Sequence, residues 1–192
     1  MVFIMPVFLK QFNSLCLLLV LLLVSHSVFS AGFTITKAKT HLLDDVYLLN
    51  ATFDYQLSEV TIEALKNGVA LTLVLSIVIE RERSYVWDQT IASLTQSYEL
   101  KYSALSKQYI LKYKNTGIQE TFPSLKEILS RINQLTDFPL LDKYLIKNNQ
   151  TYIVSLQIEL DIESLPISLR PIAYLSSKWR LSSDWYLCPL KP

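Results

Sequence analysis

Glycine is scarce in this sequence, whose 192 residues contain only Gly32, Gly68 and Gly117. Loops that cradle a phosphate need several closely spaced glycines, because the backbone must approach the ligand and adopt conformations with positive φ. The sharp strand-to-helix turn that presents a catalytic serine has the same requirement. The three glycines stand far apart in the chain, so the sequence excludes both arrangements.

Cysteine and histidine are just as rare, with two of each. Cys16 and His26 lie in the first thirty residues, which leaves His41 and Cys188 in the rest of the chain. An internal disulfide needs a second cysteine, and a zinc site usually needs three or four nitrogen or sulfur ligands. A Cys–His nucleophile pair would require these two residues to meet. We interpret His41 as a surface residue and Cys188 as a partly buried thiol, and we expect no catalytic set, metal or cofactor.

Neither sign of charge is in surplus, since 18 Lys and Arg residues face 17 Asp and Glu residues. A protein that binds nucleic acid usually shows a basic excess that neutralises phosphates. The balance found here therefore predicts no nucleic-acid partner.

The longest apolar run, residues 15–24, follows Lys10 and precedes a stretch of small residues that ends at Ser30. A basic start, an apolar centre of this length and a small-residue exit are typical of a secretory signal peptide. A membrane-spanning helix needs about 20 apolar residues, roughly twice this run. We predict a signal peptide over residues 1–30 and a single exported, β-rich domain over residues 31–192. The alternative is an uncleaved segment that anchors the protein to the inner membrane by residues 15–29.

Apolar and polar residues alternate with a period of two through most of the remaining chain, as in half-buried strands. The clearest predicted strands cover residues 33–40, 46–57, 70–83, 92–105 and 151–162. Short turns, such as Asp44-Asp45 and residues 115–117, join several of them. We therefore predict a mainly β (α+β) fold, an antiparallel β-sandwich-like domain of about eight strands with two short helices. A single curved sheet wrapped on the second helix is the alternative.

Two helices have recognisable first residues. Ser58 is placed to cap the segment SEVTIEALKNG, and Ser124 with Glu127 forms a capping box before a helical apolar stripe. That stripe extends to Leu135, after which we expect a loop at Pro139.

The segment ERERSYVWD holds the first candidate binding residues, Arg81, Arg83 and Trp87. The two arginines share one side of a strand and could together bind an anionic group. In the alternative interpretation their stems cover apolar surface and Trp87 closes the edge of the sheet.

Carboxylates offer a weaker candidate, because Glu159, Asp161 and Glu163 alternate along a predicted strand. Paired acids can serve a glycosidase or hold Ca²⁺. We interpret these three as a solvated outer face.

The C-terminal segment repeats the motif LSSxW, as LSSKW and then LSSDW. An offset of six residues returns to the same side of a strand. The motif therefore predicts a final strand whose core-facing residues are Trp179, Leu181, Trp185 and Leu187. A short helical turn begins ahead of it at Pro171. Binding residues would then lie beside the strand, and we name Arg170, Tyr174 and Arg180.

The pieces VYLLNATFDYQLS, IERERSYVWD and LPISLRPIAYLSSKWRLSSDWY resemble domain-of-unknown-function family 4390, exported proteins of Gram-negative bacteria. The resemblance covers nearly the whole chain after the first thirty residues. It implies a periplasmic address and brings no catalytic residues. It also implies an accessory role next to a membrane sensor kinase, because genes of the family stand beside genes for such kinases.

These observations favour a non-enzymatic binding or accessory protein of the bacterial envelope, with a protein partner. Membrane contact is expected only through the N-terminal segment. The alternative is a carrier or sensor of an apolar ligand such as a lipid, since the strands are apolar enough to line a cavity. A hydrolase of the cell envelope that uses acidic residues ranks third.

Overall fold

The structure is a computed structural model that describes residues 32–83, 87–147 and 149–191. The predicted signal peptide or anchor in residues 1–30 lies outside this part of the chain. Within it, no helix combines the length and the apolar character needed to cross a membrane.

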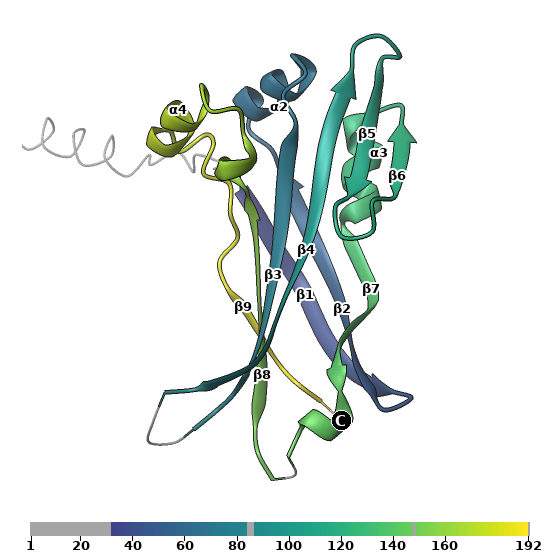
Figure 1. The fold of residues 1–192 in the computed structure, drawn as a ribbon, viewed down its shortest axis with the longest axis vertical. Coiled ribbons are helices and arrows are strands. Elements are labelled where there is room, and N and C mark those ends of the chain that lie inside the picture. Colours follow the sequence, from purple (N-terminus) through teal and green to yellow (C-terminus); the bar gives the residue numbers. More distant parts are fainter. Residues whose placement is uncertain (1–31, 84–86, 148, 192) are drawn as a thin grey trace, which may run out of the picture. The chain divides into compact units, whose positions relative to one another are not determined.

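Two antiparallel sheets make up the domain, as Figure 1 shows. The smaller sheet has the strand order β1-β2-β7, with β1 (Gly32–Leu43), β2 (Val46–Gln56) and β7 (Gln134–Asp142). The larger sheet has the order β6-β5-β4-β3-β8-β9, with β3 (Leu71–Arg81), β4 (Gln89–Ser103), β5 (Gln108–Tyr113), β6 (Gln119–Phe122), β8 (Tyr152–Leu160) and β9 (Tyr186–Pro189). The predicted mainly β, antiparallel fold class is confirmed.

Three short α-helices and two 3₁₀ turns connect these strands in the described residues: α2 (Glu59–Lys66), α3 (Leu125–Ile132), α4 (Arg170–Leu175), η1 (Lys143–Leu145) and η2 (Ile162–Ser164). Ser58 and Ser124 accept hydrogen bonds from the backbone N–H groups of Thr61 and Glu127, so both predicted caps are confirmed. The third helix, α4, occupies the segment where the sequence predicted a short helical turn.

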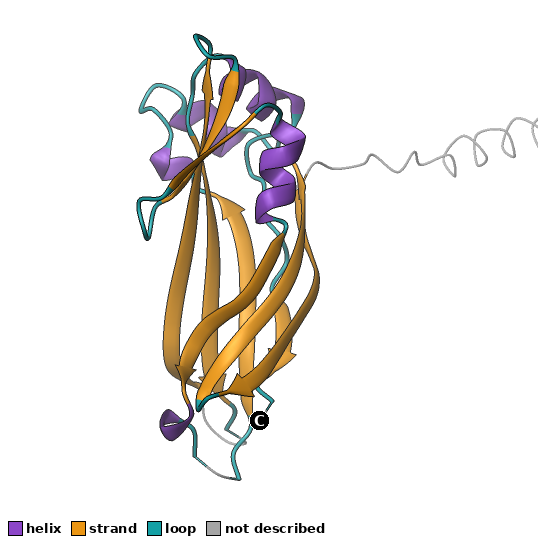
Figure 2. Cartoon of the chain, turned by 90° about the vertical axis from the view of Figure 1, so that its right-hand side faces the viewer, coloured by secondary structure: helices purple, strands orange, loops and turns teal. Residues whose placement is uncertain are grey.

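The core lies between the two sheets, which form the two layers of strands visible in Figure 2. Every second residue of β2 and β3 faces inward, so the period of two in the sequence becomes one buried face per strand. Among the described residues, the core runs from Phe33 to Cys188. Residues 31–192 thus contain this core and both sheets, and we expect them to fold without the preceding residues.

One edge of the sandwich is joined by a side chain. The hydroxyl of Thr40 in β1 donates to the carbonyl oxygen of Pro189 in β9 at 2.9 Å and accepts from the N–H of Lys191 at 2.8 Å. Thr40 is buried, so these bonds satisfy a polar group that would otherwise be costly to enclose.

Two predictions about the segment after α3 are wrong. The helix ends at Ile132, so Leu135 does not belong to its stripe, and Pro139 lies within strand β7 instead of a loop. Proline has no N–H to donate, but β7 is an edge strand and tolerates it there.

The C-terminal prediction is wrong about the strand and half right about burial. The last strand, β9, begins only at Tyr186, and Trp179 lies in a turn after α4. Trp179 and Leu181 are buried as expected, whereas Trp185 and Leu187 are 49% and 62% exposed. The cause is a shift of phase at Ser183, whose buried hydroxyl accepts from the N–H of Ile158 in β8 at 3.0 Å. Before Ser183 the buried residues are the odd-numbered Trp179 and Leu181, whereas after it the buried residue is the even-numbered Cys188. A shift of one residue exchanges the two faces of a strand.

Candidate functional site

Arg81 and Arg83 converge on one oxygen atom at the end of the β3–β4 hairpin. Arg81 pairs with Gln89 across the two strands, and the Nη2 atoms of both arginines donate to Oε1 of Gln89. Arg81 also donates through Nη1 to Oε1 of Gln150 at 2.9 Å. The sequence placed the two arginines on one side of a strand, and the structure brings their guanidinium groups together.

Further hydrogen bonds hold this arginine pair in place. The Tyr152 hydroxyl donates to Oε1 of Gln150 at 3.2 Å and accepts from the N–H of Lys147 at 3.0 Å. On the other side, the N–H of Arg83 donates to Oδ1 of Asp88 at 3.0 Å. The guanidinium groups are therefore supported from three segments: β3, the start of β4 and the chain leading into β8.

The arginine pair has no carboxylate partner among the described residues. Five ion pairs occur in this part of the chain, and neither Arg81 nor Arg83 takes part in them. Their side-chain acceptors are neutral amide oxygens, which bind a guanidinium less strongly than a carboxylate or phosphate does. An incoming anion would improve both contacts.

Trp87 stands in the same loop and is 94% exposed. The alternative in which Trp87 closes the edge of the sheet is therefore wrong, because strand pairing resumes only at Gln89 and no neighbouring strand covers the indole. Tyr144 in η1 is another exposed aromatic residue at this end of the domain. We call Arg81, Arg83 and Trp87 the arginine–tryptophan site.

The other predicted binding residues, Arg170, Tyr174 and Arg180, lie at the opposite end. Arg81 is opposite Tyr152 at one end of the β3–β8 pair, whereas α4 follows the far end of β8. The eleven residues of β3 separate the two groups by about 33 Å along the strand. The six residues named from the sequence therefore form two separate groups (Figure 1).

At the far end, Glu163 is the shared partner of Arg170 and Tyr174. Arg170 Nη1 lies 3.2 Å from Oε2 of Glu163, and the Tyr174 hydroxyl donates to its Oε1. This hydrogen bond to the carboxylate raises the pKa of Tyr174. Arg170 also donates through Nε to the carbonyl oxygen of Leu165 at 2.9 Å, so it stabilises the turn before α4. Arg180 is exposed.

The three carboxylates expected on one strand are placed differently. Glu159 belongs to β8, Asp161 accepts from the N–H of Glu163 at the start of η2, and Glu163 pairs with α4. In the described residues, no three His, Cys, Asp or Glu side chains come close enough to hold a metal ion.

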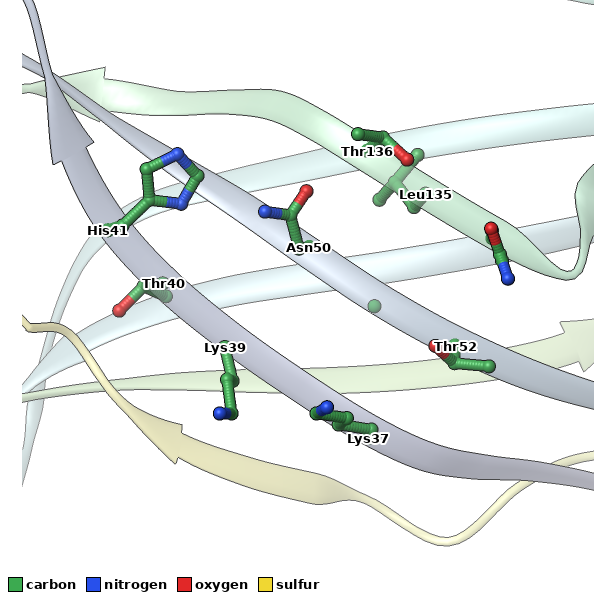
Figure 3. Close-up of a pocket in the computed structure, with 10 residues that line it drawn as sticks. Lys37, Lys39, Thr40, His41, Asn50, Thr52, Leu135 and Thr136 are labelled. Carbon is green, nitrogen blue, oxygen red and sulfur yellow. The ribbon is translucent and has the colours of Figure 1, made fainter.

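Sequence reasoning missed a polar hollow of about 460 Å³ on the outer face of the smaller sheet (Figure 3). Lys37, Lys39 and His41 line it from β1, and Asn50 lines it from β2. Asn50 Oδ1 accepts from the N–H of Asp137, which lies at a register shift of β7 with φ of 50°. A regular strand with Phe33 and Ile35 inward would also turn Lys37 and Lys39 inward, but a register shift of β1 between Ile35 and Lys37 turns the lysines outward. Neither this shift nor the one in β7 has a sequence signal.

His41 and Cys188 do not form a nucleophile pair. His41 lies on the outer face, with Nε2 3.4 Å from Oδ1 of Asp137, while the Cys188 side chain is buried in the core. Burial raises the pKa of the Cys188 thiol to about 11, so the thiol stays protonated near neutral pH.

Comparison with known proteins gives one match. The family model of DUF4390, a domain of unknown function, matches residues 30–189. No curated protein and no solved structure matches the chain.

Proposed function

Because this chain belongs to the DUF4390 family, whose function is unknown, we propose its role from its own residues: it is a non-enzymatic binding module of the bacterial envelope. Its partner is a protein that offers an acidic group to Arg81 and Arg83 and an apolar pocket to Trp87. Export is proposed from the N-terminal sequence alone. A membrane sensor kinase, which the family resemblance implies, is the first partner to test.

One observation carries this proposal: two guanidinium groups share the neutral Oε1 atom of Gln89, in the same loop region as the exposed Trp87. Tryptophan and arginine are the residues most enriched among those that dominate binding energy in protein interfaces. A fixed pair of guanidinium groups loses little conformational freedom on binding, because the strands and Gln150 already orient it. A carboxylate of the partner would replace a weak acceptor with a strong one.

The interior of the domain gives less support to the alternative function, a carrier or sensor of an apolar ligand. Leu49, Ile77 and Leu156, which face the space between the sheets, are completely buried, so side chains fill that space. Such a ligand would have to bind on the surface. Native mass spectrometry of the protein purified from cells tests this alternative, since a bound lipid adds to the mass.

Site-specific photo-crosslinking in the cells that make the protein tests the proposed binding site. A photoreactive amino acid in place of Trp87 should give a crosslink to a discrete partner, and one in place of Lys39 should not. The Arg81→Gln/Arg83→Gln variant should lose the Trp87 crosslink. Lys37→Gln/Lys39→Gln removes the same amount of charge from another exposed surface and should keep it.

Two results would contradict the proposal. One is a Trp87 position that gives no crosslink although the protein is folded and exported. The other is a crosslink that survives in Arg81→Gln/Arg83→Gln, or that disappears equally in Lys37→Gln/Lys39→Gln.

A further inference from the structure

Exposed aliphatic side chains gather around α4, at the end of the domain opposite the arginine–tryptophan site. Ile167, Ile172 and Leu175 are 79%, 61% and 87% exposed, and we call these three residues the apolar tip. The segment is held to the domain by Ala173, which is fully buried, and by Leu165. Ile172 and Leu175 therefore project outward from a helix that is anchored through Ala173, and Ile167 projects from the turn before it.

We propose that the apolar tip inserts into the surface of a lipid bilayer, so that the domain docks on a membrane through its α4 end. This contact is additional to the N-terminal segment, through which the sequence alone predicted membrane contact.

The position of the first strand argues for a bilayer as the occupant. Gly32 at the start of β1 pairs with Gln56, and the nearby Ser58 hydroxyl donates to the carbonyl oxygen of Lys178, just after α4, at 2.7 Å. The start of β1 and α4 are thus at the same end of the domain (Figure 1).

The apolar run of the N-terminal sequence ends close to this point along the chain. Residues 25–31 are all that separate it from Gly32, and seven residues span at most about 25 Å when fully extended. While that run is in a membrane, before cleavage or as a retained anchor, the start of β1 stays within this distance of it. The end of the domain that carries the apolar tip is then the end next to the lipid.

The residues around the tip suit a membrane interface. Tyrosine, here Tyr174, is enriched at the membrane–water interface. Long basic side chains such as Lys178 and Arg180 can direct their charges toward water or lipid phosphates. The carboxylate of Glu163 is paired with Arg170 and Tyr174, which lowers the cost of bringing it close to lipid.

Charge makes a small contribution to this docking. Glu59 and Glu63 on α2 offset Lys178 and Arg180, so the aliphatic groups must supply most of the affinity. We expect binding to vesicles of neutral phosphatidylcholine as well as to mixed vesicles of phosphatidylethanolamine and phosphatidylglycerol.

Vesicle flotation of residues 31–192 tests the proposal without the N-terminal apolar run. The protein should float with both kinds of vesicle. The Ile167→Gln/Ile172→Gln/Leu175→Gln variant should have a vesicle partition coefficient at least about tenfold lower, because three aliphatic side chains no longer insert into the bilayer. As a matched control, Leu43→Gln/Ile118→Gln/Leu187→Gln changes three exposed aliphatic residues outside the tip and should bind as the unchanged protein does.

A fluorescent label reports the contact directly. Cys188 is the single cysteine in residues 31–192 and is buried, so in a Leu175→Cys variant an environment-sensitive dye attaches to residue 175. Its emission should shift to the blue when vesicles are added, and a label on Leu43→Cys should not shift.

The proposal is overturned if the unchanged protein fails to float while its circular dichroism shows the folded β domain. It is also overturned if the tip variant and the control variant lose binding equally. A third contrary result is a concentration-dependent dimer that requires the tip residues while vesicles bind nothing, since the tip would then be an interface between two copies of the chain.

Discussion

Trp179 and Trp185 occupy the same position of the two LSSxW repeats, yet the structure predicts very different effects when each is changed to alanine. Trp179 is 4% exposed and belongs to the core, whereas Trp185 is about half exposed. The pair tests the assignment of burial on the two sides of Ser183, because the same residue type follows the same Leu-Ser-Ser segment in both repeats while burial differs.

The magnitude follows from the buried area. A tryptophan in a core buries about 200 Å², and at about 25 cal/mol per Å² its removal forfeits about 5 kcal/mol as an upper estimate. Measured Trp→Ala changes in cores are about 3–5 kcal/mol. Trp179→Ala should therefore lower the free energy of unfolding by about 3–5 kcal/mol. Trp185→Ala leaves no enclosed cavity and should lower it by about 1–2 kcal/mol.

Urea unfolding followed by far-UV circular dichroism measures both values on residues 31–192. In a domain of this size each kcal/mol corresponds to about 2–4 °C in Tm, so Trp179→Ala should melt about 6–20 °C below the unchanged protein. Acrylamide quenching gives a second readout, because Trp179→Phe should remove the most protected part of the tryptophan emission. Equal losses for the two alanine variants, or a larger loss for Trp185→Ala, would refute the assignment of faces.

Four further predictions concern buried polar groups. The Tyr113 hydroxyl is buried and has no hydrogen bond of normal geometry in the described structure, although its pKa is raised by burial and also by the nearby carboxylate of Glu120. Tyr113→Phe should therefore leave the free energy of unfolding unchanged or raise it by up to about 1 kcal/mol. Tyr55→Phe, which removes a buried hydrogen bond, should lower it by about 1 kcal/mol, and both are read from urea curves. Burial raises the pKa of Cys188 from 9.0 to about 11, so the unfolded chain loses this proton first as the pH rises. The thiol's contribution is therefore complete below pH 9 and lost between pH 9 and 11, and Cys188→Ala should flatten that part of the pH–stability curve. Ser58→Ala removes the cap of α2 and the bond to the carbonyl of Lys178, and should cost about 1–2 kcal/mol in chemical unfolding.

The strands that the sequence predicted best are those in which one face is buried along its whole length. In β3 the fully buried residues Leu73, Leu75 and Ile77 alternate with half-buried positions, and both neighbouring strands keep them in register. Period-two patterns arise because burial alternates along a regular strand, so they are visible without knowledge of the partner strands. The helix caps were equally visible, because a cap is a contact within four residues.

The sequence-based predictions of strands and buried faces failed where the pairing between strands is irregular. Pro139 was expected in a loop because proline disfavours strands, yet an edge strand accommodates it. Trp185 and Leu187 were expected inside because the repeat was read as one regular strand. The hydroxyl of Ser183 interrupts that strand by bonding to Ile158, which is 25 residues away, and nothing near Ser183 in the sequence reveals this contact.

The candidate site was likewise predictable from the sequence only in part. Arg81 and Arg83 were placed together from their spacing alone, since residues two apart share a face of a strand. Their supports could not be foreseen, because Gln150 lies 69 residues from Arg81 and reaches it through the pairing of β3 with β8. The separation of this pair from Arg170, Tyr174 and Arg180 also depends on that pairing.

The sequence by itself determined the mainly β class, the inward faces of the regular strands, the capped helix starts and the lack of the usual zinc ligand set. These properties depend on composition or on contacts between residues close in the chain. Only the tertiary structure decided that the two arginines share Gln89, that Trp185 faces outward, and that three aliphatic residues project at the end where β1 begins. Those outcomes depend on which distant strands pair and in what register, and a local sequence pattern does not contain that information.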